Sequence, residues 1–242
     1  MLYYEGNVRV ILYFNSQSDI IIKPNYQHEL QALIYNNIDK EIASNIHDFK
    51  NKKDRTYKYF TFSYIFSNNT KYDNVNKNIN FGKEIYFIFS TINEELFKSL
   101  IKTLKFNPNV YISNNKLRLS KIKICNSFNF NTSQKITMMS PIVIYSTENN
   151  KTRYYNPNDK EFSEQIKNNI IRKYKACYNN FNDDNFEIFQ INNIKKEITN
   201  YKGFIIEGYL GNFEIKSSKE LIQLSYEVGL GSKNSQGFGL WL

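Results

Sequence analysis

The chain has 242 residues, of which 41% are hydrophobic and 16% aromatic, and its 32 Lys and Arg outnumber 23 Asp and Glu to give a formal charge of +9. Such a composition excludes a disordered chain, and the length suits two compact domains. The positive charge favours a polyanionic partner, with nucleic acid ahead of a membrane surface, although a composition rich in lysine and asparagine does not decide this alone.

The N-terminal segment and the cysteines argue against several protein classes. Residues 1–14 alternate like a strand and lack the basic start, apolar run and cleavage site of a signal peptide. No stretch approaches the ~18 apolar residues of a membrane span, so we expect a cytoplasmic protein without membrane association. Cys125 and Cys177 lie far apart and outside any CxxC pair, which indicates neither a disulfide framework nor a zinc site.

Hydrophobic periodicity predicts a strand, two helices, two strands, a helix and further strands in the first half. The clearest helix is at 26–38, where Leu30, Leu33, Ile34 and Ile38 form one stripe. The asparagine-rich stretch 67–80 is expected to be a turn or a long hairpin loop. The other predicted elements are strands at 5–14, 58–66 and 84–91, one or two strands within 110–124, and helices at 39–49 and 93–106, the latter capped by Asn93 or Thr91.

The second half repeats this order of elements without repeating the sequence. Strands are predicted at 136–146, 186–199, 203–216 and 237–242, and helices at 161–178 and 218–229. A strand, helix, strand, strand, helix, strand order produces an antiparallel sheet with two helices on one face. We therefore predict an α+β protein made of two tandem ferredoxin-like (βαββαβ, RRM-like) domains, residues 1–130 and 131–242.

The last fourteen residues, GLGSKNSQGFGLWL, contain four of the nine glycines. They match neither the P-loop pattern nor the dinucleotide fingerprint, and no helix follows to receive a phosphate. QGFGLWL is similar to the RNP1 motif of RNA-binding domains, but RNP1 belongs on an internal strand. Two interpretations stay open: a loop whose amides and Lys233 cradle a phosphodiester, or a helix cap at Gly229 followed by close packing around Gly237 and Gly239.

The stretch SYEVGLGSKNSQGFG resembles the C-terminal loop of the CRISPR-associated endoribonucleases of Cas family six, in the RAMP superfamily. The resemblance extends to YQHELQALIY at 26–35, NIHDF at 45–49 and KYFTFS at 58–63, in the family's order, and to the middle around TMMSPIVIY. It therefore covers nearly the whole chain. The family fold is two tandem ferredoxin-like domains, which agrees with the order of elements above.

RNA cleavage without a metal requires the 2'-hydroxyl to attack the adjacent phosphate, assisted by a base, an acid and a cation. On a helical wheel His47 and Tyr35 both lie off the apolar stripes of their helices. The resemblance places His47 at the family's catalytic histidine, Tyr35 at a tyrosine that works opposite it, and Lys58 at the lysine that stabilises the transition state. It implies metal-independent cleavage without a cofactor, leaving a 2',3'-cyclic phosphate and a 5'-hydroxyl.

Two further groups of residues are expected to contact RNA or to join the site. The basic run between His47 and Lys58 is assigned to the RNA backbone, and one of its cations is an alternative to Lys58. His28 lies two turns before Tyr35 and is a further candidate for the site. The predicted RNA contacts are Lys50, Lys52, Lys53, Arg55, Gly229, Gly231, Lys233, Asn234, Ser235 and Gly237.

The expected partner is CRISPR repeat RNA, with other Cas proteins of an effector complex as further candidates. Two alternatives stay open: a non-catalytic RAMP protein that binds CRISPR RNA in such a complex, and an RRM-like RNA-binding protein without nuclease activity. The repeat sequence, the need for an RNA hairpin, and the choice between monomer and homodimer are left undetermined.

Overall fold

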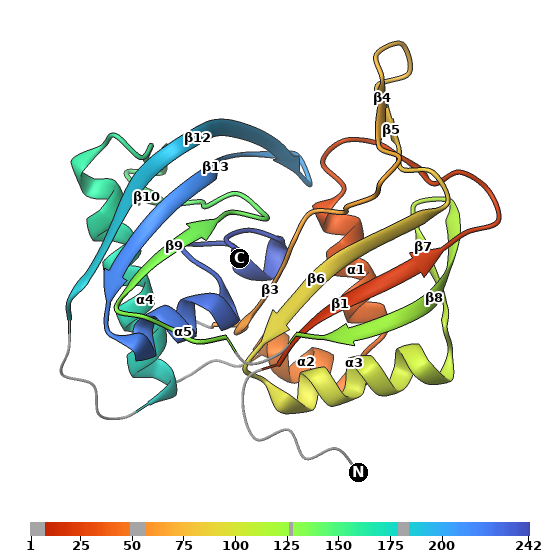
Figure 1. The fold of residues 1–242 in the computed structure, drawn as a ribbon, viewed down its shortest axis with the longest axis horizontal. Helices are drawn as coiled ribbons and strands as arrows, with labels where there is room; N and C mark the ends of the chain where they lie inside the picture. The colour runs from red at the N-terminus through yellow and green to blue at the C-terminus, as the bar shows by residue number, and fades with distance from the viewer. Residues whose placement is uncertain (1–7, 49–56, 126–127, 179–183) are drawn as a thin grey trace.

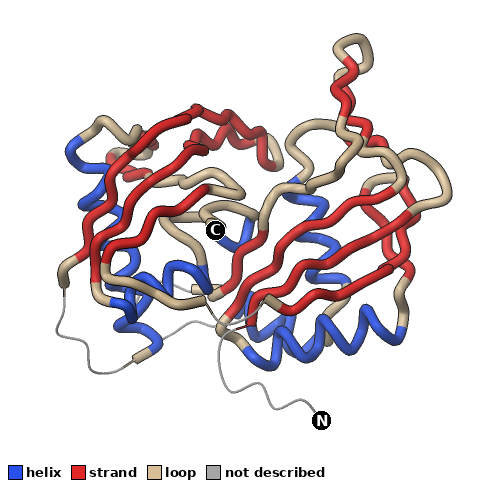
Figure 2. Tube along the Cα trace, in the orientation of Figure 1, coloured by secondary structure: helices blue, strands red, loops and turns tan. Residues whose placement is uncertain are grey.

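The computed structural model describes residues 8–48, 57–125, 128–178 and 184–242. Two halves lie side by side, and each consists of an antiparallel sheet with helices packed on one face (Figures 1 and 2). The predicted α+β class is confirmed. Each half has its own hydrophobic core, one formed by residues between 10 and 117 and the other by residues between 136 and 241. The boundary between residues 130 and 131 stays a prediction.

The N-terminal sheet has the strand order β3-β6-β1-β8-β7, with every pair antiparallel. Its strands are β1 (Val8–Asn15), β3 (Phe60–Phe62), β6 (Glu84–Thr91), β7 (Asn109–Ile112) and β8 (Asn115–Ile124). In this order β6 lies between β1 and β3, which is the split βαβ arrangement of a ferredoxin-like unit. The stretch 110–124, for which one or two strands are predicted, forms a hairpin of two strands, whereas the strand predicted at 58–66 is regular only over three residues.

Three helices cover the N-terminal core as the apolar periodicity predicts. They are α1 (Gln27–Asn36), α2 (Lys40–Asp48) and α3 (Glu94–Phe106). Leu30, Leu33 and Ile34 of α1 are buried. Asn93 is the N-cap of α3, because its Oδ1 accepts a hydrogen bond from the amide of Leu96 at 2.9 Å.

The asparagine-rich stretch forms a hairpin that projects from this half (Figure 1). Its strands β4 (Lys71–Asp73) and β5 (Asn78–Asn80) pair with each other, and β5 also pairs with β2 (Ile21–Ile22). Asp73 accepts hydrogen bonds from the amides of Val75 and Asn76 and so closes the turn. The predicted hairpin loop is therefore a small three-stranded sheet with a turn at its tip.

The C-terminal half has the sheet order β12-β13-β9. Its elements are β9 (Ser133–Thr137), α4 (Lys160–Cys177), β12 (Phe186–Tyr201), β13 (Phe204–Ser217), α5 (Lys219–Val228) and a 3-10 turn, η1 (Asn234–Gln236). The predicted terminal strand forms only a bridge, with Trp241 opposite Met138. The amide of Leu242 donates to the carbonyl of Thr137 at 2.9 Å, and the carbonyl of Leu242 accepts from the amide of Thr137 at 2.7 Å. The terminal segment therefore occupies the position of a fourth strand.

The strand predicted at 136–146 is interrupted. β9 ends at Thr137, and the amide of Met138 still donates to the carbonyl of Gly211 in β13 at 3.0 Å. The amides of Met139 and Ser140 instead turn to the terminal segment, where both donate to the carbonyl of Leu240. The chain then forms a hairpin of β10 (Tyr145–Glu148) and β11 (Lys151–Tyr154). Pro141, which lacks an amide hydrogen, stands at the break.

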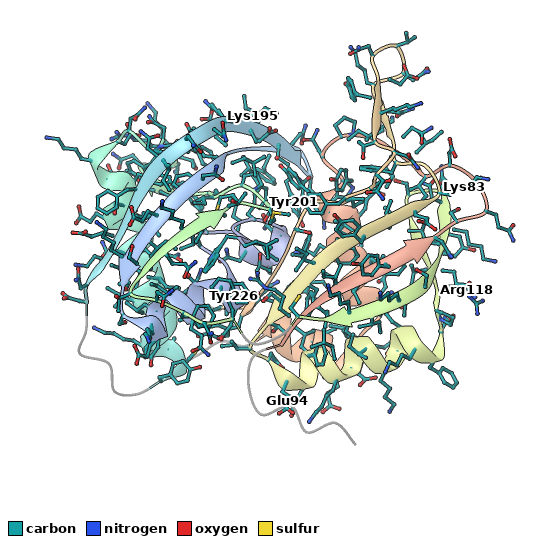
Figure 3. All side chains as sticks on the ribbon, in the orientation of Figure 1. Lys83, Glu94, Arg118, Lys195, Tyr201 and Tyr226 are labelled. Atoms are coloured by element: carbon teal, nitrogen blue, oxygen red, sulfur yellow. The ribbon has the colours of Figure 1, made fainter. Side chains whose placement is uncertain are left out.

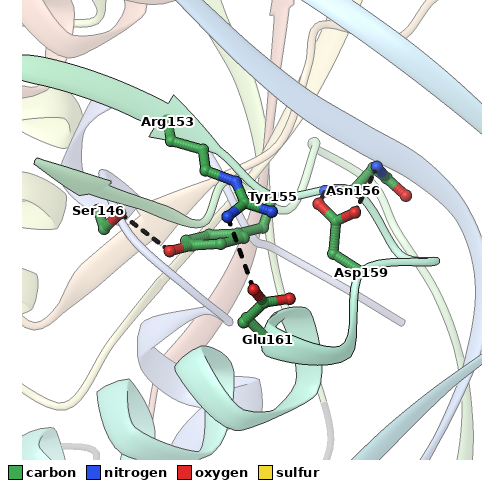
Figure 4. Close-up of polar contacts among 6 residues, drawn as sticks. All are labelled: Ser146, Arg153, Tyr155, Asn156, Asp159 and Glu161. Carbon is green, nitrogen blue, oxygen red and sulfur yellow. Dashed lines mark hydrogen bonds and ion pairs between the residues drawn. The ribbon is translucent and has the colours of Figure 1, made fainter.

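Polar contacts fasten this hairpin to the start of α4 (Figure 4). Ser146 and Tyr155 share a hydrogen bond of 2.9 Å between Oγ and the phenol oxygen, and Arg153 lies 3.6 Å from a carboxylate oxygen of Glu161. Asp159 accepts from both the amide and the side chain of Asn156. Of these contacts the Arg153–Glu161 ion pair is the one that reaches α4, and it contributes little because it is exposed. The hydrogen bonds order the hairpin and the turn before the helix.

Arg9 joins the two halves. This buried residue of β1 donates to the carbonyl of Trp241 at 2.6 Å and to the carbonyl of Tyr226, and its guanidinium carbon lies 3.2 Å from the centre of the Tyr226 ring. Tyr226 stands between the halves in Figure 3. Burial lowers the pKa of Arg9 to about 10, so its charge is retained at neutral pH.

Arg9→Ala should destabilise the protein by about 3 kcal/mol, because two buried carbonyls lose their donors and the cation–π contact disappears. Urea denaturation measures the change. Arg118→Ala, which removes an exposed arginine from β8, should shift stability by less than about 0.5 kcal/mol. Equal effects of the two variants would show that Arg9 does not join the halves.

None of the helices among the described residues combines the length and the apolar character that crossing a bilayer requires.

Candidate active site

A pocket of about 520 Å³ lies where the two halves meet. One wall is the segment leading into β3, another is the loop that follows α5, and α4 and β10 complete it. Three of its lining residues are lysines and none is acidic. The lining residues are Tyr57, Lys58, Tyr59, Phe60, Tyr145, Asn169, Lys173, Val228, Gly231, Ser232, Lys233, Asn234, Ser235 and Gln236.

The loop of residues 229–240, called here the glycine loop, packs its backbone directly against the first half. All four of its glycines have positive φ. A Cβ atom on Gly237 would lie 2.4 Å from the Phe62 ring, and one on Gly239 would lie 2.0 Å from the carbonyl of Leu230. Thr61 donates to the carbonyl of Phe238 at 2.9 Å. The glycines are therefore required for close packing, which was one of the two interpretations of the sequence.

This finding corrects the expectation for two of the predicted RNA contacts. Gly229 and Gly237 are not part of the pocket lining, and their amides donate to the carbonyls of Ser225 and Asn234. Gly229 also caps α5 with φ of 84°. Both positions serve the packing of the loop because they have neither an exposed surface nor a free amide to offer.

The other four predicted loop residues line the pocket and have free amides. Within the described residues, no acceptor is found for the backbone N–H groups of Gly231, Lys233, Asn234 and Ser235. A cluster of backbone N–H groups attracts an anion, so the loop can cradle a phosphate as well as pack closely. The two interpretations of the glycines thus apply to different residues of one loop.

A buried lysine of α4 supports the loop from beneath. Lys173 donates to the carbonyls of Gly229 and Gly231 at 3.0 and 2.8 Å and to the side-chain oxygen of Asn234 at 2.6 Å. Burial is the main reason why its pKa falls to about 7, and Arg172 lowers it further. The side chain of Asn234 is occupied within the loop, so an RNA contact from this residue would come from its backbone.

Lys58 and Lys233 supply the accessible positive charge of the pocket. Both are half-buried, and burial lowers the pKa of each. Lys233 extends over the ring of Tyr145, with Nζ 4.8 Å from its centre. Neither lysine forms an ion pair with any described residue. A phosphate placed between them would therefore find two uncompensated cations.

Tyr35 lies directly behind Lys58. The ammonium of Lys58 is 5.5 Å from the centre of the Tyr35 ring, and Phe60 packs edge-on against the same ring at 6.0 Å. Burial, with a smaller effect from Tyr201, raises the pKa of Tyr35 to about 12. The phenol is therefore neutral at physiological pH and is suited to hydrogen bonding rather than to proton abstraction.

His47 is the penultimate residue of α2, but its side chain lies outside what the structure describes. The same holds for the whole basic run of Lys50, Lys52, Lys53 and Arg55, since residues 49–56 are not described. The roles assigned to these five residues stay predictions. The described part of the site is thus the tyrosine, the lysine at 58 and the glycine loop.

His28 lies on the face of α1 that meets the second half, but it contacts the tip of the β12–β13 hairpin. Its ring is edge-on to Tyr201 at 6.3 Å between centres, and its Nδ1 lies 3.1 Å from the carbonyl of Asn25. One turn further, Gln31 accepts from the Tyr201 hydroxyl and donates to the carbonyl of Ser235 at 2.6 Å. Tyr201 stands between the halves in Figure 3, so α1 connects the hairpin to the glycine loop.

The sequence argument missed several pocket residues, of which Lys173 matters most. Lys173 lies on the same buried stripe of α4 as Ile166 and Ile170. A lysine is rarely found on an apolar stripe, so its position in the sequence was a signal of an unusual role. Tyr57, Tyr59 and Tyr145 carry no such signal, because they belong to irregular segments or to a short hairpin strand.

Gly239→Ala should destabilise the protein by about 3 kcal/mol, because φ is 80° and the added methyl meets a backbone carbonyl. Gly203→Ala is the matched control: φ is 87°, but nothing lies within 4 Å, so only the backbone strain of about 1 kcal/mol is expected. Thermal unfolding compares the two. If Gly239→Ala costs no more than Gly203→Ala, close packing does not explain the glycine.

Comparisons with known proteins agree with this fold. Two family models match the chain: Cas6 N-terminal over residues 21–123 and Cas6 C-terminal over residues 125–241. A CRISPR-associated endoribonuclease Cas6 of Pyrococcus furiosus is 29% identical over 89% of this chain and 81% of its own length. Another, from Methanocaldococcus jannaschii, is 27% identical over 97% of this chain and 92% of its own.

A solved structure described as a CRISPR-associated protein Cas6 superposes with a TM-score of 0.81 at 25% identity, covering 98% of each chain. A second, described as a RAMP protein binding different RNA substrates, reaches 0.83 at 22% identity over 97% of this chain and 98% of the other, which bears on the fold alone. The two family models together cover nearly the entire chain, so the protein belongs to the Cas6 family of CRISPR-associated proteins.

Proposed function

We propose that this protein is a metal-independent endoribonuclease that cleaves CRISPR precursor RNA within its repeats to produce guide RNA. The observation that carries the proposal is the pocket in which Lys58 faces the free amides of the glycine loop and Lys233. A polynucleotide backbone is the ligand that suits a pocket with several cations, free N–H groups and no carboxylate. The relatives named as Cas6 endoribonucleases support RNA cleavage as the reaction.

The glycine loop is the RNA holder in this proposal. Amides of Gly231, Lys233 and Ser235 bind phosphate oxygens, and the ammonium of Lys233 adds charge. The tyrosines at 57 and 145 border the same pocket and offer aromatic faces on which bases can stack. Neither stacking nor phosphate binding reads a particular base, so these contacts hold the RNA without selecting its sequence.

The cleavage chemistry takes place at the Lys58 side of the pocket. The 2'-oxygen attacks the adjacent phosphorus as its proton passes to a base, and the bond from phosphorus to the 5'-oxygen breaks as an acid protonates the leaving oxygen. His47 serves in one of these proton transfers. Lys58 stabilises the added negative charge on the phosphoryl oxygens. Because the pKa of Tyr35 is about 12, its neutral hydroxyl orients the 2'-hydroxyl instead of removing its proton.

Repeat RNA should be cleaved in the presence of EDTA to give a 2',3'-cyclic phosphate and a 5'-hydroxyl, since His47 and Lys58 replace a metal. A 2'-deoxy sugar before the scissile bond should abolish the reaction. His47→Ala should lower the single-turnover rate at least a hundredfold and change the Kd for RNA less than threefold. Gel electrophoresis and end-group analysis of the products check this. Tight RNA binding without any cleavage by the wild type would favour the non-catalytic RAMP alternative.

Lys233→Ala should weaken RNA binding five- to tenfold and reduce the slope of log Kd against log salt by about 0.7, the value for one phosphate contact on a single strand. The single-turnover rate at saturating RNA should change less than threefold. Lys175→Ala, which removes an exposed charge from α4, is the control. An unchanged slope of log Kd against log salt in Lys233→Ala would show that the loop is not part of the RNA-binding surface.

A further inference from the structure

The underside of the glycine loop is organised around a single buried cation. The Lys173 side chain is 4% exposed, and all three of its hydrogen-bond acceptors belong to the loop. An ammonium has three N–H donors, and each is directed to an acceptor within 3.0 Å. A neutral amine has two donors, so the charged form is the one that matches this set of oxygens.

Asn234 extends this set of hydrogen bonds from Lys173 to the far side of the loop, and the two residues with their bonds are called here the clamp. While its Oδ1 accepts from the lysine, its Nδ2 donates to the carbonyls of Leu230 and Phe238 at 2.9 and 3.0 Å. The lysine and the asparagine together tie the carbonyls of residues 229, 230, 231 and 238. The free amides that face the pocket stand inside this cross-linked segment.

Other contacts fasten the loop to its surroundings. The amides of Ser232 and Gly239 donate to the carbonyls of Val143 and Pro141 at 2.7 and 2.8 Å. The helix cap at Gly229 and the bridge at Trp241 fasten its two ends, and Gln31 holds the carbonyl of Ser235. Between those points the segment contains five residues with positive φ, the four glycines and Lys233. The four glycines among them have a broad choice of conformation when they are not tied down.

We propose that Lys173, acting through Asn234, is a positioning residue for RNA binding. It holds the glycine loop in the conformation whose amides receive the RNA backbone, and it does not itself contact the phosphate. This inference rests on the proposed function of the loop as RNA holder. Its three N–H groups are occupied by loop oxygens, so a direct RNA contact would require breaking the clamp.

The test compares Lys173→Met with Lys175→Met, which removes the same charge from the exposed face of the same helix. Amide hydrogen exchange measures the loop, and the Kd is measured with repeat RNA carrying a 2'-deoxy sugar before the scissile bond. In Lys173→Met, exchange in residues 229–237 should be at least tenfold faster and Kd at least tenfold weaker, while the single-turnover rate on cleavable RNA at saturation stays within threefold. Lys175→Met should match the wild type in all three.

Asn234→Ala provides a second route if Lys173→Met does not fold. It should show the same pattern, and the double variant should be no weaker in RNA binding than the more affected single variant, because both changes break one clamp. Losses in log Kd that add in the double variant would overturn the proposal, as would a rate that falls while Kd is unchanged.

The outcomes separate the clamp from the proposed function. Unchanged amide hydrogen exchange in both variants shows that the clamp does not order the glycine loop, and it leaves the proposed function intact. Faster exchange with unchanged Kd shows that the loop is clamped but does not hold RNA, which overturns the positioning role. If the wild type binds no repeat RNA, the proposed function fails, and the positioning role fails with it.

Discussion

The backbone of the glycine loop runs against β3 with no space for side chains between them, and the pocket exists because of this contact. Gly237 faces the ring of Phe62, and Thr61 holds the carbonyl of Phe238. The contact places the loop that carries the free amides opposite the segment that carries Lys58. Since one wall belongs to each half of the chain, neither half contains a complete pocket.

Two buried cations, of which Lys173 lines the pocket, are satisfied in the same way. Arg9 and Lys173 are both surrounded by backbone carbonyls, and neither pairs with a carboxylate among the described residues. Carbonyl dipoles stabilise a cation without cancelling its charge. In its charged form Lys173, whose pKa burial lowers to about 7, adds its positive potential to that of Lys58 and Lys233.

The order of elements was predictable because each helix and each long strand has a clear apolar period, as the stripe of Leu30, Leu33 and Ile34 shows. Where hydrogen bonds over long distances decide the structure, the sequence pattern is insufficient. The apolar run 136–146 suggests one strand, but contacts with the terminal segment divide it. The fourth strand of the second sheet is reduced to a bridge for the same reason.

The candidate site was predictable in its location but only partly in its detail. A glycine needed for close packing and a glycine needed near a phosphate have the same backbone requirement, so the sequence cannot distinguish Gly237 from Gly231. Lys58 and Tyr35 were located by the resemblance to Cas family six, and the structure brings their side chains together. Lys173 was missed because its acceptors lie more than fifty residues later in the chain.

The most direct measurement for the pocket as the RNA site is photo-crosslinking of repeat RNA, containing 4-thiouridine next to the scissile phosphate, to the wild-type protein. The account predicts crosslinked peptides that contain residues 57–60, Tyr145 or residues 231–236, because these residues line the pocket. Crosslinks confined to other surfaces, such as the projecting β4–β5 hairpin, would contradict it.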